Sequence, residues 1–218
     1  MGANAAVDMK LVAHSLAYPV TSRGPGRRVV LWVAGCSRRC PGCISPELLT
    51  SDAGHEVTVE RLLERLCRIE GDIEGITLSG GDPADQPGAV VELLRGLRAR
   101  RLSWNILLYT GYTLAQIQQD PDGKEALLPL VDLLIDGPFL REVAPVHPLA
   151  GSGNQELHAL TAAGEAMLRA VGAGSPPGFN LAFFREGGTR LIGVSSPAER
   201  DRVHRVLQLT SPDDDQIR

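Results

Sequence analysis

Three cysteines lie within eight residues of one another, and their spacing is suited to binding a metal centre. They are Cys36, Cys40 and Cys43, whereas the fourth cysteine, Cys67, stands apart. Such a tight cluster is more typical of a metal site in a reducing compartment than of a disulfide framework. Arg38 and Arg39 lie inside the loop. We expect their positive charge to favour the thiolate form that binds metals.

Two kinds of metal centre are compatible with this triplet. A closed structural zinc site needs four protein ligands, and neither His14 nor His55 has a recognisable ligand spacing to the cysteines. Three cysteines suit a 4Fe-4S cluster in which one iron stays open to an exogenous ligand. The C-x3-C-x2-C spacing after an apolar strand resembles that of the radical S-adenosylmethionine (SAM) superfamily. The triplet therefore favours the cluster, with zinc as the alternative.

The elements that must position this loop alternate between strands and helices. Apolar runs predict strands, periodic apolar positions predict helices, and Thr58 and Thr113 are predicted N-caps. Cys67 shares the apolar positions of the first of these helices and is predicted to be a core residue. The alternation indicates a parallel α/β architecture. The predicted strands are 29–35, 75–78, 105–108 and 131–135, and the predicted helices are 58–69, 87–101, 113–119 and 124–130.

The last third of the chain has a different pattern. Residues 144–153 are rich in proline and glycine, and residues 155–171 are predicted to be mostly helical. Residues 180–184 and 190–194 flank a Gly-Gly pair and predict a β-hairpin. Ser196 begins a capping box that predicts a helix over 196–209. We expect residues 1–155 to form the core and residues 156–218 to pack on it as a C-terminal extension.

Small and polar residues follow each predicted strand, where parallel α/β proteins gather their functional groups. Glycine and aspartate are ordinary turn residues, but four such strand ends in succession predict one shared pocket. Its contents suit SAM, because Gly80 and Gly81 let backbone carbonyls approach an ammonium group and Asp82 adds negative charge. Hydroxyl groups of the next strand end suit a carboxylate or a ribose. The residues concerned are Ser79, Gly80, Gly81, Asp82, Tyr109, Thr110, Gly111 and Asp136.

Size and charge exclude several classes of protein. The chain of 218 residues has room for one good-sized domain. A net charge of −4 gives no support to a nucleic-acid or membrane-surface partner. No apolar run approaches the roughly 18–20 residues that span a bilayer, and the first residues lack a signal-peptide core. We therefore expect a cytoplasmic protein.

Taken together, the motifs resemble one family closely. In order, they are Gly24-Pro25-Gly26, Gly35-Cys36-x3-Cys40-Pro41-Gly42-Cys43, Leu78-Ser79-Gly80-Gly81-Asp82-Pro83, Tyr109-Thr110-Gly111-Tyr112-Thr113, Asp132-Leu133-Leu134-Ile135-Asp136-Gly137-x-Phe139 and Gly151-Ser152-x-Asn154-Gln155. This series resembles the small radical SAM activases of glycyl-radical enzymes, above all those that activate the anaerobic (class III) ribonucleotide reductase. The resemblance covers residues 23–155.

The resemblance implies an incomplete (β/α) TIM-like barrel of the radical SAM type, followed here by the C-terminal hairpin and helix. It implies that Cys36, Cys40 and Cys43 ligate a 4Fe-4S cluster, and that Gly42 and the strand-end residues bind SAM. An electron from flavodoxin or ferredoxin would cleave SAM reductively to methionine and a 5′-deoxyadenosyl radical. In the family, that radical removes a hydrogen atom from a glycine of a partner enzyme.

Two other functions stay open at this stage. The residues after the triplet, 44–49, lack the aromatic and amide residues that the family usually carries, and about 60 residues follow Gln155. A radical SAM enzyme acting on a small molecule or peptide is therefore one alternative. A metal-bearing scaffold without catalysis is another, but it leaves the polar strand ends unexplained.

Overall fold

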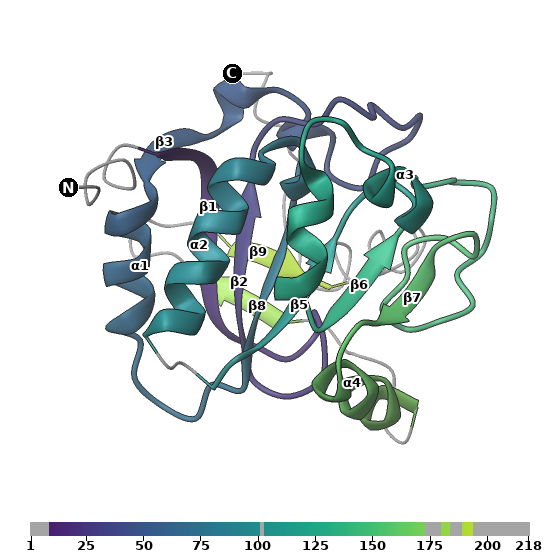
Figure 1. Ribbon diagram of the computed structural model, residues 1–218. Coiled ribbons are helices and arrows are strands. Elements are labelled where there is room, and N and C mark those ends of the chain that lie inside the picture. Colours follow the sequence, from purple (N-terminus) through teal and green to yellow (C-terminus); the bar gives the residue numbers. More distant parts are fainter. Residues whose placement is uncertain (1–8, 101–102, 173–179, 184–188, 194–218) are drawn as a thin grey trace, which may run out of the picture.

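The central element is a seven-stranded sheet of mixed direction (Figure 1). The structure is a computed structural model that describes residues 9–100, 103–172, 180–183 and 189–193. The strand order is β3-β1-β2-β4-β5-β6-β7, so β3 and β7 are the two edges of the described sheet. The strands are β1 (Lys10–Val20), β2 (Arg28–Val33), β3 (His55–Thr58), β4 (Gly75–Gly80), β5 (Asn105–Tyr109), β6 (Leu133–Asp136) and β7 (Glu156–Ala159).

The four central strands, β2, β4, β5 and β6, are parallel and lie side by side in chain order. They confirm the predicted α/β class, and the outer strands β1, β3 and β7 pair antiparallel. The connections contain α1 (Val59–Cys67), α2 (Pro87–Ala99), α3 (Leu114–Gln118) and the 3₁₀ helices η1 (Pro46–Leu48), η2 (Ser51–Ala53), η3 (Pro83–Asp85) and η4 (Lys124–Leu130). Helix α4 (Ala162–Gly172) follows β7.

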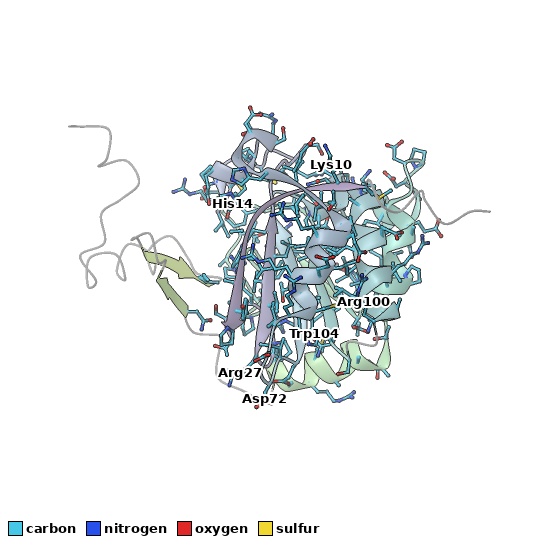
Figure 2. All side chains as sticks on the ribbon, turned by 90° about the vertical axis from the view of Figure 1, so that its left-hand side faces the viewer. Lys10, His14, Arg27, Asp72, Arg100 and Trp104 are labelled. Atoms are coloured by element: carbon cyan, nitrogen blue, oxygen red, sulfur yellow. The ribbon has the colours of Figure 1, made fainter. Side chains whose placement is uncertain are left out.

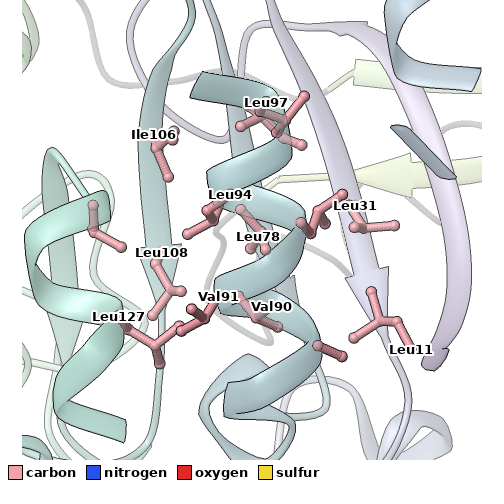
Figure 3. Packing of buried hydrophobic residues seen from close by; sticks show 14 of the residues in the cluster. Leu11, Leu31, Leu78, Val90, Val91, Leu94, Leu97, Ile106, Leu108 and Leu127 are labelled. Atoms are coloured by element: carbon pink, nitrogen blue, oxygen red, sulfur yellow. The ribbon is translucent and has the colours of Figure 1, made fainter. Parts of the chain in front are cut away.

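The helical connections cover one face of the sheet, and the main core lies between them and the strands. Alternate residues point to this face because side chains change sides along a strand. In Figure 3, Leu94 of α2 lies close to Leu78, with Ile106 in the same cluster, and Leu127 of η4 lies beside Leu108. All five side chains are fully or almost fully buried. The helices and the strands therefore form two layers around one core.

The opposite face of the sheet packs against different segments. The hairpin of β8 (Asn180–Phe183) and β9 (Thr189–Ile192) lies on this side, away from α1 and α2 (Figures 1 and 2). Its Ile192 packs with Val30 and Trp32 of β2. The amide oxygen of Asn180 accepts the backbone N–H groups of Thr21 and Ser22, at 3.0 and 2.9 Å. The predicted hairpin is thus confirmed, and side chains hold it against the sheet.

The N-caps expected from the sequence are present. Thr58 accepts the backbone N–H of Arg61 at the start of α1. Thr113 and Gln116 form a reciprocal capping box at the start of α3. Each bond satisfies a helix N–H that has no partner inside the helix. None of the helices in the described part of the chain is long and apolar enough to cross a membrane.

One expectation from the sequence holds in part and another is wrong. Residues 155–171 are mostly helical, as expected, because α4 covers 162–171, but the first part of the segment forms the strand β7. Cys67 is exposed, not part of the core. It is the last residue of α1 and lies about 100° around the helix from the buried Leu66, at the edge of the apolar stripe. The helix predicted over 196–209 lies outside the described residues.

Candidate functional site

The carboxyl ends of β2, β4 and β5 and the loop after β6 open on one pocket of about 130 Å³. Ten of the twelve predicted site residues line it, and Gly42 and Asp136 are not among its lining residues. A larger cavity, about 600 Å³, lies between β1, β3 and α1, but it contains no cysteine. The predicted residues in the smaller pocket are Cys36, Cys40, Cys43, Ser79, Gly80, Gly81, Asp82, Tyr109, Thr110 and Gly111.

The cysteine loop is folded by its own backbone and by the segment that follows it. The N–H of Cys36 donates to the carbonyl of Leu49 at 3.1 Å, and the N–H of Cys43 donates to the carbonyl of Cys40 at 3.1 Å. Gly42 has a φ of 69°, a conformation that L side chains rarely adopt. Gly42 therefore shapes the turn between the second and third cysteines. All three cysteines are half-buried, and none of them forms a disulfide bond within the described structure.

The spacing of the three sulfurs suits a cluster better than a single ion. Among the described residues, Cys36, Cys40 and Cys43 do not form a group whose ligand atoms all lie within 4.8 Å of one another. Sulfur ligands of one tetrahedral zinc ion would be only about 3.8 Å apart, because each Zn–S bond is about 2.3 Å long. In a four-iron cluster each cysteine binds its own iron, so the sulfurs can stand further apart. The donor set therefore fits a 4Fe-4S cluster with one iron free of protein ligands.

The environment of Cys36 differs from the sequence-based expectation. Burial raises the pKa of its thiol, and the nearby carboxylates of Asp82 and Asp85 raise it further. Backbone N–H groups of Arg38 and Arg39 lower this pKa, against the effect of burial. The guanidinium of Arg38 stacks on the ring of Tyr112, 4.9 Å from its centroid. The expectation that the arginine charges favour the thiolate is therefore wrong for Cys36, where backbone dipoles act instead.

Two glycines at the end of β4 allow this strand end to contact the end of β2. A Cβ atom on Gly80 would lie 2.3 Å from the carbonyl oxygen of Val33, and one on Gly81 would lie 2.2 Å from that of Gly35. The N–H of Gly81 donates to Val33, and the N–H of Asp82 donates to Gly35, at 2.8 and 2.9 Å. These contacts bring the end of β4 against the start of the cysteine loop. Only glycine fits such a close backbone approach.

Asp82 joins the ends of β4 and β5. Its buried carboxylate accepts hydrogen bonds from the hydroxyl of Thr110 at 2.9 Å, the N–H of Gly111 at 2.9 Å and the N–H of Ala84 at 3.0 Å. Burial raises the pKa of Asp82 to about 6, although the Gly111 N–H lowers it. The carboxylate lines the pocket, but it already accepts hydrogen bonds from Thr110, Gly111 and Ala84. Its binding of SAM stays a prediction.

A polar network that the sequence analysis missed holds the residue after Cys36. The carboxylate of Asp85 accepts the N–H of Ser37 at 2.6 Å, its hydroxyl at 2.9 Å and the hydroxyl of Tyr112 at 2.6 Å. Two cations contact the ring of Tyr112, because the guanidinium of Arg38 and Nζ of Lys124 each lie 4.9 Å from its centroid. The network links the cysteine loop to η3 and to the end of β5. Of these residues only Tyr112 stands in one of the family motifs, and the pairing depends on tertiary contacts.

Asp136 is not among the residues that line the pocket, and its carboxylate contacts residues near the edge of the sheet. Its carboxylate accepts the N–H of Leu114 at 2.6 Å and that of Glu156 at 3.2 Å, and His158 Nε2 lies 3.0 Å away. These contacts join the start of α3 to β7. Its predicted contact with a ribose or a substrate is not tested by this arrangement.

Comparison with known proteins agrees with this geometry. Residues 22–158 match the family model described as a 4Fe-4S single cluster domain. The anaerobic ribonucleoside-triphosphate reductase-activating protein of Vibrio cholerae is 36% identical over 151 residues, which are 66% of this chain and 96% of that protein. The protein of the same name from Escherichia coli is 31% identical over 150 residues, with the same coverage. That of Haemophilus influenzae is 33% identical over 141 residues, 62% of this chain and 89% of that protein.

The chain belongs to this family of activating proteins. The match includes all three cysteines of the triplet and the four strand ends that line the pocket. It ends before α4 and the β8–β9 hairpin. The family resemblance inferred from the motifs is therefore confirmed.

The last family motif also has a structural role. The Gln155 side chain accepts the N–H groups of Gly151 and Ser152, at 2.7 and 3.2 Å, and donates to the carbonyl of Gly137 at 3.0 Å. Asn154 donates to the carbonyl of Pro138 at 2.8 Å. The two amides fasten the loop after β6 to the segment before β7. This loop carries Phe139 into the pocket wall.

Two arginines, Arg23 and Arg28, precede or begin β2. The sequence analysis assigned neither of them to the site. Arg28 is fully buried and donates to Thr77 Oγ1 at 2.7 Å and Asn105 Oδ1 at 2.6 Å, as well as to backbone carbonyls. Burial lowers the pKa of Arg28 to about 10. Arg23 lines the pocket, with its guanidinium 5.8 Å from the centroid of the Tyr109 ring.

Proposed function

We propose that this protein activates an anaerobic ribonucleoside-triphosphate reductase by forming a glycyl radical on it. The observation that carries the proposal is the convergence of the cysteine triplet and the glycine-rich strand ends on one pocket. The relatives that support it are named as activating proteins of that reductase.

The cofactors of the proposed reaction are a 4Fe-4S cluster on Cys36, Cys40 and Cys43 and SAM at the strand ends. When bound, they would supply the reductive cleavage of SAM to methionine and a 5′-deoxyadenosyl radical, which takes a hydrogen atom from the partner's glycine. The electron would come from reduced flavodoxin or ferredoxin. Cofactors carry the difficult chemistry in such enzymes, and the protein binds, orients and shields them.

The residues of this chain would act mainly by holding the cysteine loop and the pocket wall in place, and less by acid–base chemistry. The Asp85 network fixes the loop after Cys36, and Gly81 brings the end of β4 against that loop. Asp82 holds Thr110 and Gly111 at the pocket wall. Phe139 and Ile44 add apolar surface there, which would limit the access of water to a reactive intermediate.

We further interpret the sheet as an incomplete barrel of the radical SAM type, with residues 156–218 as an extension of the same domain. The sequential parallel strands and their one-sided helices support this interpretation. We also propose a cytoplasmic location, because a group of three cysteines that forms no disulfide suits a reducing compartment.

The first test is the metal content. Protein reconstituted anaerobically should bind about four irons per chain and give a cluster-type EPR signal after reduction, and Cys40→Ala should abolish that signal. Cys67→Ala is the matched control, because Cys67 is exposed and outside the pocket. Zinc in place of iron after anaerobic purification would refute the proposal.

The second test follows the hydrogen atom. With dithionite and SAM the protein should release 5′-deoxyadenosine, and a reductase deuterated at its glycines should transfer deuterium into that product. Release of 5′-deoxyadenosine with deuterium only from a deuterated metabolite or peptide would instead assign the chain to the small-molecule class of radical SAM enzymes.

A further inference from the structure

The cavity between β1, β3 and α1 is separate from the cysteine pocket. Its volume is about 600 Å³, and the two cavities share no lining residue. Sites that bind small molecules typically have volumes of about 300–1,000 Å³. The cavity is therefore large enough for a ligand of its own, and the proposed radical reaction does not use it.

The floor of this cavity is an edge of the main core. Leu31 of β2 and Leu62 of α1 line the cavity and are buried, and the half-buried Leu16 and Val57 pack against the same cluster. The pairing of β1 with β3 covers only Lys10–Ala13, so Leu16 lies beyond it. An apolar floor of this kind favours a ligand that carries an apolar group, because contact with that group removes both surfaces from water.

One face of α1 forms a positively charged rim. Arg61, Arg65 and Arg68 line the cavity, and their four- and three-residue spacing places them on the same face of the helix. They are exposed, and the row extends about 10 Å along the helix axis. Helix α1 lies beside α2 at the outer end of the helical layer (Figure 1). A ligand on the apolar floor would therefore lie beside several guanidinium groups.

Two of these positive charges are not neutralised by the protein. The carboxylate of Glu64 lies 3.8 Å from the guanidinium of Arg68, and that of Glu56 lies 2.8 Å from the ammonium group of a lysine in β1. These are the two glutamates that line the cavity. Within the described ranges of the chain, no carboxylate lies within 4 Å of the guanidinium of Arg61 or Arg65. Arg61 and Arg65 are thus the charges that remain for a ligand.

We propose that this cavity binds a nucleoside diphosphate or triphosphate, with the phosphates on Arg61 and Arg65 and the base on the apolar floor. Guanidinium groups form paired, charge-assisted hydrogen bonds with phosphate oxygens. Two guanidinium groups one helical turn apart suit linked phosphates. An inorganic anion would leave the apolar floor in contact with water, and a fatty acid has a single carboxylate for two arginines. The inference does not rest on the proposed function and adds a second ligand site.

The test is a calorimetric titration of the full chain with ADP. Cluster-loaded protein is used with saturating SAM and without reductant, so that an adenosyl group already occupies the proposed cofactor site. ADP should bind at one site per chain and about tenfold more tightly than inorganic pyrophosphate, because only ADP covers the apolar floor. Absence of ADP binding, or equal affinities for ADP and pyrophosphate, would overturn the proposal.

Variants assign the binding to α1. Arg61→Gln and Arg65→Gln should each weaken ADP binding by about tenfold, since each removes a charge-assisted hydrogen-bond donor. Arg95→Gln is the matched control, because Arg95 is an exposed arginine of α2 that does not line the cavity. The three variants should have equal urea midpoints, which separates loss of binding from loss of folding. ADP affinity that is unchanged in Arg61→Gln and Arg65→Gln would refute the proposed site.

A measurement on the wild-type protein does not depend on variants. Phenylglyoxal modifies exposed arginine side chains, and saturating ADP should slow its reaction with Arg61 and Arg65 but not with Arg95. Mass spectrometry of the digested protein measures the three rates. Equal rates with and without ADP at Arg61 and Arg65 would contradict the inference. No radical chemistry is needed, so the result is independent of the proposed reaction.

Discussion

Ser37 donates both its backbone N–H and its hydroxyl group to the carboxylate of Asp85, at 2.6 and 2.9 Å. The residue that follows Cys36 is thereby fixed to η3, the first turn after β4. Because Tyr112 donates to the same carboxylate, one side chain holds three segments together beside the cysteine loop.

The first prediction concerns this network. Asp85→Asn should speed the loss of the cluster to a chelator by about three- to tenfold, since replacing a charged acceptor weakens its hydrogen bonds by about 1 kcal/mol or more. The decay of the visible absorbance after chelator addition measures the rate. Asp72→Asn is the control, because Asp72 is exposed (Figure 2) and is not among the residues that line the pocket. Identical decay in both variants would show that Asp85 does not hold the loop.

The second prediction concerns the contact between β4 and the cysteine loop. Gly81→Ala should destabilise the fold by about 2 kcal/mol or more, because its Cβ would lie 2.2 Å from the Gly35 oxygen, and backbone must move to relieve the overlap. Urea denaturation of both proteins gives the difference. Gly172→Ala, where the added methyl group meets nothing within 4 Å, should be nearly neutral. A small effect for both variants would contradict the argument.

The third prediction concerns the buried Arg28. Arg28→Lys should cost about 2–4 kcal/mol of folding free energy, since an ammonium group cannot reach Thr77, Asn105 and the backbone carbonyls at once. The same change at the exposed Arg27 should cost less than about 0.5 kcal/mol. Chemical denaturation of the two variants compares them directly, and equal stabilities would be the contrary result.

The fourth prediction concerns pH and the carboxyl group of Asp82. Its folded-state pKa of about 6 exceeds the unfolded value of about 3.9, so the folded protein binds more protons between these values. Stability should therefore fall as pH rises from 4 to 7, by up to about 3 kcal/mol on account of this group. Denaturation of the cluster-free protein across this range should show a steeper fall for wild type than for Asp82→Asn. Parallel curves would contradict the prediction.

The sequence predicted the central part of the fold well because its signals are local. The continuous apolar run over 29–34 marks β2, and the capping residues Thr58 and Thr113 mark two helix starts. The strand ends could be grouped into one pocket because parallel strands end at the same edge. Such inferences need only the period of the pattern and the direction of the strands.

The parts that were missed depend on tertiary contacts. Strand β1 was not predicted, since its residues are mostly half-buried and lack a clear alternation, and pairing with both β2 and β3 forms it. Strand β7 has only four residues and depends on its pairing with β6. The meeting of Arg23 with Tyr109 joins two positions 86 residues apart, a pairing that no local pattern indicates.

The β8–β9 hairpin has a consequence for how such a chain could change over time. In the described structure, no backbone hydrogen bond joins it to the seven-stranded sheet, and Asn180 and Ile192 provide its side-chain attachments. Removing the hairpin would break none of the backbone hydrogen bonds described for the seven-stranded sheet. A segment attached in this way can be altered, exchanged or acquired while the cysteine pocket keeps its geometry, so the hairpin and the pocket can change independently of each other.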